Sequence, residues 1–337
     1  KLSLFDGTAS FAPKIVYTPL NGAGYKPVTE ILKRIGVKDL TVVPEQAYPD
    51  GDFPTCPYPN PEEKAALGLA IELAEKTNAD MVLATDPDAD RVGIAVRKKD
   101  GSFRLFNGNE TGAIMENFIL SVKSKNGSMP NNPVIVKTIV TSDMTTDIAK
   151  KYGAEVKEVL TGFKYIGETI DSLEDPEDYV LGMEESYGYL VGRHVRDKDS
   201  VSAAMIIAEA AAYYSSLGKT LIDALEDLYA EFGYYKTALV SRVYPGEKGK
   251  EEMDALISGL REKPLTEIAG MKINEFKDYS RGIENLPKSN VLSFIGDGIK
   301  VIVRPSGTEP KVKYYLTAKR PTEKESDEIV ELLKKNI

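Results

Sequence analysis

Short apolar runs alternate with helical patterning through the first hundred residues of the chain. Three of these runs have the composition of buried strands, at residues 14–20, 41–43 and 79–84. Helical patterns at residues 27–35 and 60–77 separate them, and for the second we predict Asn60 as the N-cap and Pro61 as the first helical residue. This order of strands and helices predicts a parallel sheet covered by helices.

The same alternation continues to about residue 230. Helices are predicted at residues 109–123, 143–152 and 201–216, and strands at residues 133–137, 154–159 and 179–183. From Tyr234 onward the pattern changes, because segments 291–295 and 299–303 flank a Gly-Asp-Gly turn in a hairpin pattern. A strand at 312–317 and a charged helix follow.

We therefore predict an α/β chain in which two consecutive mixed or parallel α/β sheet domains precede a smaller α+β domain. The predicted domains are residues 1–100, 101–232 and 233–337.

Charge and cysteine content exclude several classes of protein. The 337 residues hold 43 basic and 52 acidic side chains, a net charge of −9, which argues against a nucleic-acid partner. Cys56 is the single cysteine, so the sequence has no internal disulfide and no cysteine metal cluster, and a reducing cytoplasmic location is expected. No apolar run is long enough to span a membrane, so no membrane partner is expected.

The acidic segment at residues 85–91 (Thr-Asp-Pro-Asp-Ala-Asp-Arg) follows the strand at 81–84 and precedes another at 92–96. Its carboxylates alternate at positions i, i+2 and i+4, as Asp86, Asp88 and Asp90. In an extended loop this spacing can turn all three toward one point, and such hard oxygen ligands suit Mg²⁺. Ligands also tend to bind at the carboxyl ends of parallel strands.

Other interpretations of the acidic segment exist. An EF-hand would need Gly at the sixth position and Glu at the twelfth, where this chain has Arg91 and Arg97, so that class is excluded. A metal-dependent phosphatase with Asp86 as nucleophile stays open, and so does a solvated acidic turn.

Residues 304–308 (Arg-Pro-Ser-Gly-Thr) end a predicted strand with groups that suit phosphate. A guanidinium offers a bidentate fork, hydroxyls add donors, and glycine lets backbone N–H groups approach an anion. An ordinary turn between strands is the alternative.

Residues 182–188 combine carboxylate and hydroxyl groups in a glycine-bounded loop, which suits sugar hydroxyls, and a basic run ending at Lys198 follows. Residues 161–164 (Thr-Gly-Phe-Lys) form a possible helix start. The turn at residues 21–24 is not a dinucleotide fingerprint, since its third glycine would fall on Pro27.

In this order the segments resemble those of the α-D-phosphohexomutases, the family of phosphoglucomutase and phosphomannomutase. The resemblance extends over nearly the whole chain, through residues 18–22, 59–62, 86–91, 161–164, 182–188 and 304–310. Residues 184–189 together with 196–199 look most like the bacterial phosphoglucomutase branch.

The resemblance implies an intramolecular phosphotransferase that interconverts hexose 1-phosphate and hexose 6-phosphate, with glucose favoured over mannose. In this family a phosphoserine of the first domain donates its phosphoryl group, a hexose 1,6-bisphosphate intermediate reorients, and the enzyme takes back the other phosphoryl group. The bisphosphate would also serve as activator, and sugar phosphates would be the small-molecule partners.

The resemblance also implies roles for particular residues. One Mg²⁺ ion would be held by Asp86, Asp88 and Asp90. Arg91 would neutralise phosphoryl charge, and Lys198 would lie near the reacting oxygen. Substrate would be bound by Thr161, Gly162, Glu184 and Ser186 at the sugar, and by Arg304, Ser306, Gly307 and Thr308 at the non-reacting phosphate.

The family's Thr-Ala-Ser-His-Asn-Pro nucleophile loop does not occur in the sequence. Residues 8–10 read Thr-Ala-Ser, but Phe11 follows, so Ser10 is not expected to be the nucleophile. We expect the chain to correspond to domains two to four, to need the missing N-terminal domain as a partner, and to be inactive alone. A non-catalytic sugar-phosphate-binding module remains an alternative.

Overall fold

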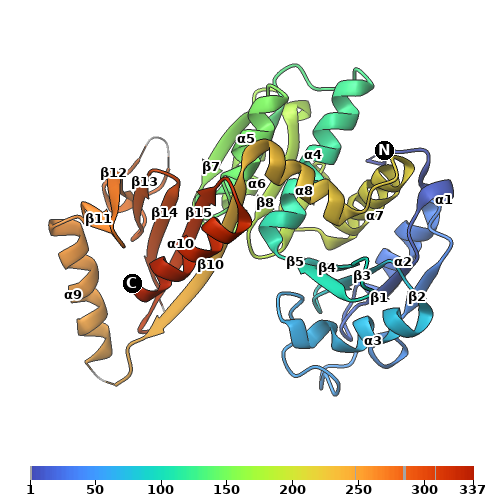
Figure 1. Cartoon of the computed structure of the whole chain (residues 1–337), viewed down its shortest axis with the longest axis horizontal. Coiled ribbons are helices and arrows are strands. Elements are labelled where there is room, and N and C mark those ends of the chain that lie inside the picture. The colour runs from blue at the N-terminus through green and yellow to red at the C-terminus, as the bar shows by residue number, and fades with distance from the viewer. Residues whose placement is uncertain (1, 247, 284–285, 308) are drawn as a thin grey trace. The chain divides into compact units, whose positions relative to one another are not determined.

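A computed structural model describes residues 2–246, 248–283, 286–307 and 309–337 (Figure 1). The chain divides into two compact units, Lys1–Asp227 and Leu228–Ile337. Among the described residues, the first unit contains two mixed sheets and the second a single antiparallel sheet, so the predicted α/β class is confirmed. No helix among the described residues combines the length and the apolar character needed to cross a membrane.

The first sheet has the strand order β2-β1-β3-β4-β5. Its strands are β1 (Ile15–Thr18), β2 (Leu40–Val42), β3 (Met81–Thr85), β4 (Val92–Arg97) and β5 (Phe103–Phe106). Strand β1 pairs in parallel with both β2 and β3, whereas β4 runs antiparallel to β3 and β5. Helix α3 (Gly68–Thr77) packs on β1 and β3 and buries Ala70 and Ala74 against Val16 and Val82. The acidic segment is therefore the connection between the central strand β3 and its neighbour β4.

One predicted helix boundary is wrong. Helix α3 begins at Gly68, after a 3₁₀ turn at Lys64–Leu67, and not at Asn60. The Asn60 side chain instead accepts a hydrogen bond from the Glu62 N–H at 3.0 Å and closes a tight turn. Pro61 lies directly over β4, since a Cβ atom on Gly93 would be 2.8 Å from Pro61 Cβ. This packing holds residues 60–63 in a turn, which local helix signals do not reveal.

The second sheet has the strand order β7-β6-β8-β9. Its strands are β6 (Val134–Thr138), β7 (Glu155–Val159), β8 (Tyr179–Glu184) and β9 (Gly188–Val191). Strand β6 is parallel to β7 and β8, and β9 returns antiparallel to β8. The β8–β9 hairpin places the predicted sugar loop at its turn.

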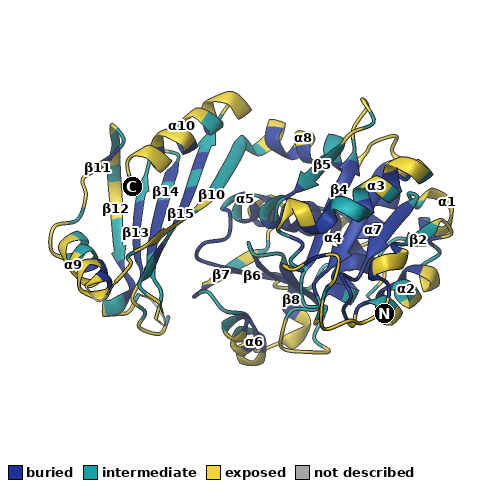
Figure 2. Ribbon diagram, turned by 90° about the horizontal axis from the view of Figure 1, so that it is seen from below, coloured by how far each residue is buried: buried dark blue, intermediate teal, exposed yellow. Residues whose placement is uncertain are grey.

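The other helices of the first unit pack on the two sheets or on one another. They are α1 (Thr8–Phe11), α2 (Tyr25–Arg34), α4 (Gly108–Lys125), α5 (Met144–Lys151), α6 (Phe163–Ser172) and α7 (Ser200–Ser216). The apolar α7 is buried along most of its length and contacts α1 and α2 as well as α4 and β9 (Figure 2). Asn107 and Glu110 form a capping box at the start of α4. Because α7 packs on elements associated with both sheets, the loops of the two sheets can meet in one site.

The second unit is built on a six-stranded antiparallel sheet, in the order β10-β15-β14-β13-β12-β11. Its strands are β10 (Tyr234–Val243), β11 (Glu267–Ile268), β12 (Met271–Asp278), β13 (Leu292–Gly296), β14 (Ile299–Pro305) and β15 (Lys311–Arg320). Helices α9 (Gly249–Glu262) and α10 (Glu323–Lys335) contribute Met253 and Leu333 to the core around Phe294. Helix α8 (Leu221–Phe232) precedes β10 in the chain. The predicted hairpin is confirmed as β13–β14.

Candidate active site

The acidic loop between β3 and β4 gathers three carboxylates. Oxygen atoms of Asp86, Asp88 and Asp90 all lie within 4.8 Å of one another. Asp86 is buried and Asp88 is exposed, so the group opens from the sheet edge to solvent. Asp86 Oδ1 accepts hydrogen bonds from the backbone N–H groups of Asp90 and Arg91, each at 2.9 Å. These bonds wrap the loop around the Asp86 carboxylate.

Two other segments hold the acidic loop in place. The Ala23 N–H donates to the Pro87 carbonyl at 2.7 Å. A Cβ atom on Gly22 would lie 2.3 Å from Pro87 Cα, so only glycine permits this approach. From the other side, Ser200 at the start of α7 donates to the Ala89 carbonyl through its N–H at 3.2 Å and its hydroxyl at 2.5 Å. The glycine-rich turn at residues 21–24 thus supports this loop.

Charge on the three carboxylates is poorly balanced by the loop itself. Burial, together with the nearby charges of Asp90 and Asp88, raises the pKa of Asp86 to about 7, although the N–H groups of Arg91 and Asp90 oppose this rise. A carboxylate that resists ionisation for these reasons would be stabilised by a nearby cation. Three convergent carboxylate oxygens form a donor set that fits Mg²⁺, and we conclude that the triad could hold this metal.

Arg91 leaves the acidic loop toward a second acidic group. Its Nη1 is 2.7 Å from Glu62 Oε1, whereas its Nε is 3.9 Å from Asp86 Oδ2 and 3.8 Å from Asp90 Oδ1. The backbone of Arg91 forms a β-bridge with Gly188 of β9. The acidic loop and the β8–β9 hairpin are therefore joined at Arg91.

Lys198 contacts the acidic loop from the segment before α7. Its Nζ is 2.8 Å from Asp90 Oδ2 and 3.1 Å from Asp197 Oδ1. Burial opposes the lysine charge, but the hydrogen bonds to Asp90 and Asp197 outweigh it, and the net effect raises the pKa of Lys198. The lysine side chain passes over Gly188, where a Cβ atom would be 2.3 Å from Lys198 Cδ.

The other members of the basic run have partners elsewhere. Arg196 pairs with Asp171 at 2.6 Å and Arg193 pairs with Glu177. His194 Nε2 is 2.9 Å from Asp199 Oδ2. Within the described part of the chain, Lys198 is thus the residue of this run that has an ion pair with the acidic loop.

Glu184 and Gly162 meet at the end of β8. The Gly162 N–H donates to Glu184 Oε1 at 2.9 Å, and Gly162 forms the N-cap of α6 at φ +123°. Burial raises the pKa of Glu184, while the Gly162 N–H and the charges of Lys198 and Arg91 oppose that rise. Thr161 Oγ1 is buried and has no hydrogen-bond partner among the described residues. Ser186 lies half-buried in the β8–β9 turn.

The structure thus groups part of the predicted site. Contacts connect Asp86, Asp88, Asp90, Arg91 and Lys198. Glu184 contacts Gly162 and is close enough to Lys198 and Arg91 for their charges to affect its pKa, and Thr161 and Ser186 are adjacent to this pair in the chain. The predicted phosphate loop lies in the second unit, between β14 and β15. There the Ser306 N–H donates to the Lys311 carbonyl at 2.7 Å, Arg304 is half-buried and Gly307 is exposed. Thr308 lies outside the described residues.

Two acidic residues at the site received no role from the sequence. Glu62 lies in the 59–62 signature but was not assigned as an Arg91 partner. Burial raises the pKa of Glu185 to about 7. The backbone N–H of Glu185 itself opposes this rise, and the charge of Glu184 adds to it. Glu185 Oε2 accepts a hydrogen bond from the Thr138 hydroxyl at 3.2 Å. The only local sequence signal for a role of Glu185 was its place directly after Glu184 and before Ser186.

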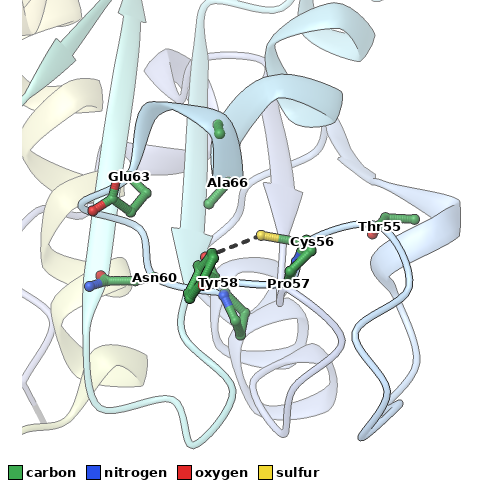
Figure 3. Close-up of a pocket in the computed structure, with 9 residues that line it drawn as sticks. Thr55, Cys56, Pro57, Tyr58, Asn60, Glu63 and Ala66 are labelled. Carbon is green, nitrogen blue, oxygen red and sulfur yellow. Dashed lines mark hydrogen bonds between the residues drawn. The ribbon is translucent and has the colours of Figure 1, made fainter.

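A cavity of about 640 Å³ lies next to the Glu62 turn but contains none of the predicted site residues (Figure 3). It is lined by Thr55, Cys56, Pro57, Tyr58, Pro59, Asn60, Glu63, Ala65 and Ala66. The Cys56 thiol donates to the Tyr58 carbonyl at 3.3 Å, and burial raises the pKa of Cys56. The candidate site is thus defined by converging side chains and not by this cavity.

Comparison with known families agrees with this geometry. Residues 6–101 match the family model "Phosphoglucomutase/phosphomannomutase, alpha/beta/alpha domain II", and residues 107–232 match the model for domain III. The chain therefore belongs to the α-D-phosphohexomutase family.

Among relatives, the phosphoglucomutase of Staphylococcus aureus strain USA300 is 37% identical over 319 residues. The match covers 91% of this chain and 57% of the S. aureus protein, so the chain spans little more than half the length of that relative.

Solved structures share the fold at lower identity. The open form of pp63/parafusin, a phosphoglucomutase from Paramecium, superposes with a TM-score of 0.73 and 20% identity, over 98% of this chain and 59% of that one. The Aspergillus fumigatus N-acetylphosphoglucosamine mutase, in complex with GlcNAc-6P and magnesium, has a TM-score of 0.54 and 14% identity. The superposition covers 98% of this chain and 62% of the A. fumigatus chain.

Proposed function

We propose that this site catalyses phosphoryl transfer on hexose phosphates and interconverts hexose 1-phosphate and hexose 6-phosphate, with glucose as the first sugar to test. The observation that carries the proposal is the convergence of the three carboxylates with Arg91 and Lys198 beside Glu184. Membership of a family of phosphosugar mutases supports the same reaction class.

In this proposal one Mg²⁺ ion is held by Asp86, Asp88 and Asp90. When bound, the ion would neutralise charge on the phosphoryl group, as phosphoryl transfer requires. The magnesium complex of the A. fumigatus mutase, which shares the fold, supports this choice of metal. Arg91 lies beside the triad with its guanidinium half-exposed, so its free N–H groups can reach phosphoryl oxygens.

Lys198 would act at the reacting oxygen. Its ammonium group is held by Asp90 and Asp197 at the border between the acidic loop and Glu184, where a sugar hydroxyl and a phosphoryl group would meet. A raised pKa keeps this lysine positively charged, which suits stabilising the negative charge that develops on an oxygen atom as the phosphoryl bond breaks.

The remaining predicted residues would bind the sugar phosphate. Glu184 and Ser186 would accept and donate hydrogen bonds to sugar hydroxyls, beside Thr161 and Gly162. The unpartnered Thr161 hydroxyl and the buried Glu184 would then gain partners when the sugar binds. The non-reacting phosphate would be held by Arg304, Ser306, Gly307 and Thr308, which would provide orientation and remote binding energy.

The phosphoryl-carrying serine is proposed to come from outside these 337 residues, because the family's serine loop has no counterpart in the sequence. Turnover through a hexose 1,6-bisphosphate would then require the segment that carries this serine, and the 337-residue chain alone would be inactive. Two backbone N–H groups fix Asp86 Oδ1, and in this proposal Asp86 is a metal ligand and not a nucleophile.

The test compares the 337-residue chain with the complete reading frame in conversion of glucose 1-phosphate to glucose 6-phosphate, with Mg²⁺ and glucose 1,6-bisphosphate present. We expect activity from the complete frame only. Release of inorganic phosphate that Asp86→Asn abolishes would contradict the mutase and indicate a phosphatase. Binding of glucose 6-phosphate with no conversion by either protein would indicate a binding module. Asp100→Asn, an exposed change in the β4–β5 turn, is the matched control.

A further inference from the structure

Arg91 is held by an acid outside the acidic loop. Its Nη1 is within hydrogen-bond distance of Glu62 Oε1, at 2.7 Å. Its Nε, at 3.8 to 3.9 Å from Asp86 and Asp90, is beyond hydrogen-bond distance from either carboxylate. The guanidinium is therefore drawn toward Glu62 and away from the triad.

Glu62 is fixed on a short turn that is packed on the same strand that follows Arg91. The Asn60 side chain accepts from the Glu62 N–H at 3.0 Å, and the Asn60 carbonyl accepts from the Glu63 N–H at 2.9 Å. Pro61 rests on Gly93, where any Cβ atom would come within 2.9 Å of the Pro61 carbonyl oxygen. Because Gly93 is two residues beyond Arg91, the turn places the Glu62 carboxylate at a set distance from the arginine.

Without this partner the guanidinium has a nearby alternative. An arginine fork forms strong bidentate bonds with carboxylates, and Asp86 and Asp90 are the nearest remaining acids in its ion-pair contacts. Movement of about 1 Å would bring Nε into hydrogen-bond distance of either one. An arginine in that position would compete with a metal ion for the same oxygen atoms.

We propose that Glu62 is a positioning residue that holds the Arg91 guanidinium off Asp86 and Asp90. It thereby leaves these carboxylates to a divalent cation and keeps the remaining N–H groups of Arg91 available to a phosphoryl group. The inference rests on the proposed function in one respect, namely that the triad binds a metal.

The test measures Mn²⁺ affinity of the 337-residue chain by electron paramagnetic resonance, in a double-mutant cycle of Glu62→Gln with Arg91→Met. We expect Glu62→Gln to weaken Mn²⁺ binding about tenfold in the wild-type background, the scale of one charge-assisted hydrogen bond formed by Arg91 with a ligand carboxylate. In the Arg91→Met background the same change should weaken binding less than about threefold, because no guanidinium remains to compete.

Two further variants serve as controls. Glu63→Gln removes a carboxylate from the same turn and shows how a general loss of negative charge affects the site. Its Mn²⁺ affinity should be within about twofold of the wild-type value. Glu62→Asp keeps the charge but shortens its reach, so its Mn²⁺ affinity should lie between those of the wild type and Glu62→Gln. It also provides a second test should Glu62→Gln fail to fold, as judged by circular dichroism.

The outcomes separate the inference from the proposed function. If the wild-type chain binds no Mn²⁺, the metal site and the role of Glu62 both fail. If Mn²⁺ binds but Glu62→Gln has no effect, or the same effect in both backgrounds and in Glu63→Gln, the positioning role alone is overturned.

Discussion

Binding of a divalent metal to the acidic loop should depend on pH near neutrality. Asp86 is expected to be a ligand in its ionised form, and burial together with the charges of Asp90 and Asp88 raises its pKa to about 7. Protons and the metal ion compete for the same carboxylate. The metal affinity of the loop should therefore fall as the pH falls through 7.

The size of the effect can be worked out from that pKa. Asp86 would be about nine-tenths ionised at pH 8 and about one-tenth ionised at pH 6, so the apparent dissociation constant for metal should rise about tenfold between them. Above pH 8 it should level off. A carboxylate at its ordinary pKa near 3.8 would give no change in this range.

Isothermal titration calorimetry with Mn²⁺ at pH 6, 7 and 8 measures this dependence. Asp86→Asn should bind more weakly and without the pH dependence, which separates Asp86 from Glu185, whose pKa burial also raises to about 7. Asp100→Asn should keep the wild-type profile. An apparent dissociation constant that changes less than twofold between pH 6 and pH 8 in the wild type would refute the reasoning.

Three further predictions concern stability and loop support. Glu116 of α4 is fully buried, and its carboxylate oxygens have no hydrogen-bond partner among the described residues. Glu116→Met should therefore raise the free energy of unfolding by about 1–3 kcal/mol in urea denaturation. A lower urea midpoint than that of the wild type would contradict this. Gly22→Ala should weaken Mn²⁺ binding at least about tenfold by displacing Pro87, whereas Gly51→Ala, with open space around it, should not. Thr322 caps α10, so Thr322→Ala should cost about 1 kcal/mol in the same denaturation assay, and no loss would mean that the cap adds nothing.

Much of the fold could be predicted from the sequence, because its signals lie within a few neighbouring residues. The apolar runs at 14–20 and 79–84 became β1 and β3, and the Gly-Asp-Gly turn became the β13–β14 hairpin. The alternating carboxylates of the acidic loop were recognisable for the same reason. The domain boundaries and the phosphate loop around Arg304 remain predictions.

Failures of prediction occurred where packing overrides a local signal. The pair Asn60 and Pro61 has the form of a helix start, yet α3 begins at Gly68, because Pro61 rests on Gly93 of a strand about thirty residues further along. No strand was predicted at residues 188–191, which form β9, since four residues between a loop and a basic run carry little periodic signal.

The sequence by itself determined which chemical groups the chain has and the order in which strands present them. Only the tertiary structure decided which groups meet: Arg91 with Glu62, Lys198 with Asp90, and Glu184 with Gly162. Each pair joins residues on separate elements, so its distance depends on how those elements pack and not on any local pattern. The raised pKa of Asp86 likewise comes from burial, which exists only once the chain has folded around it.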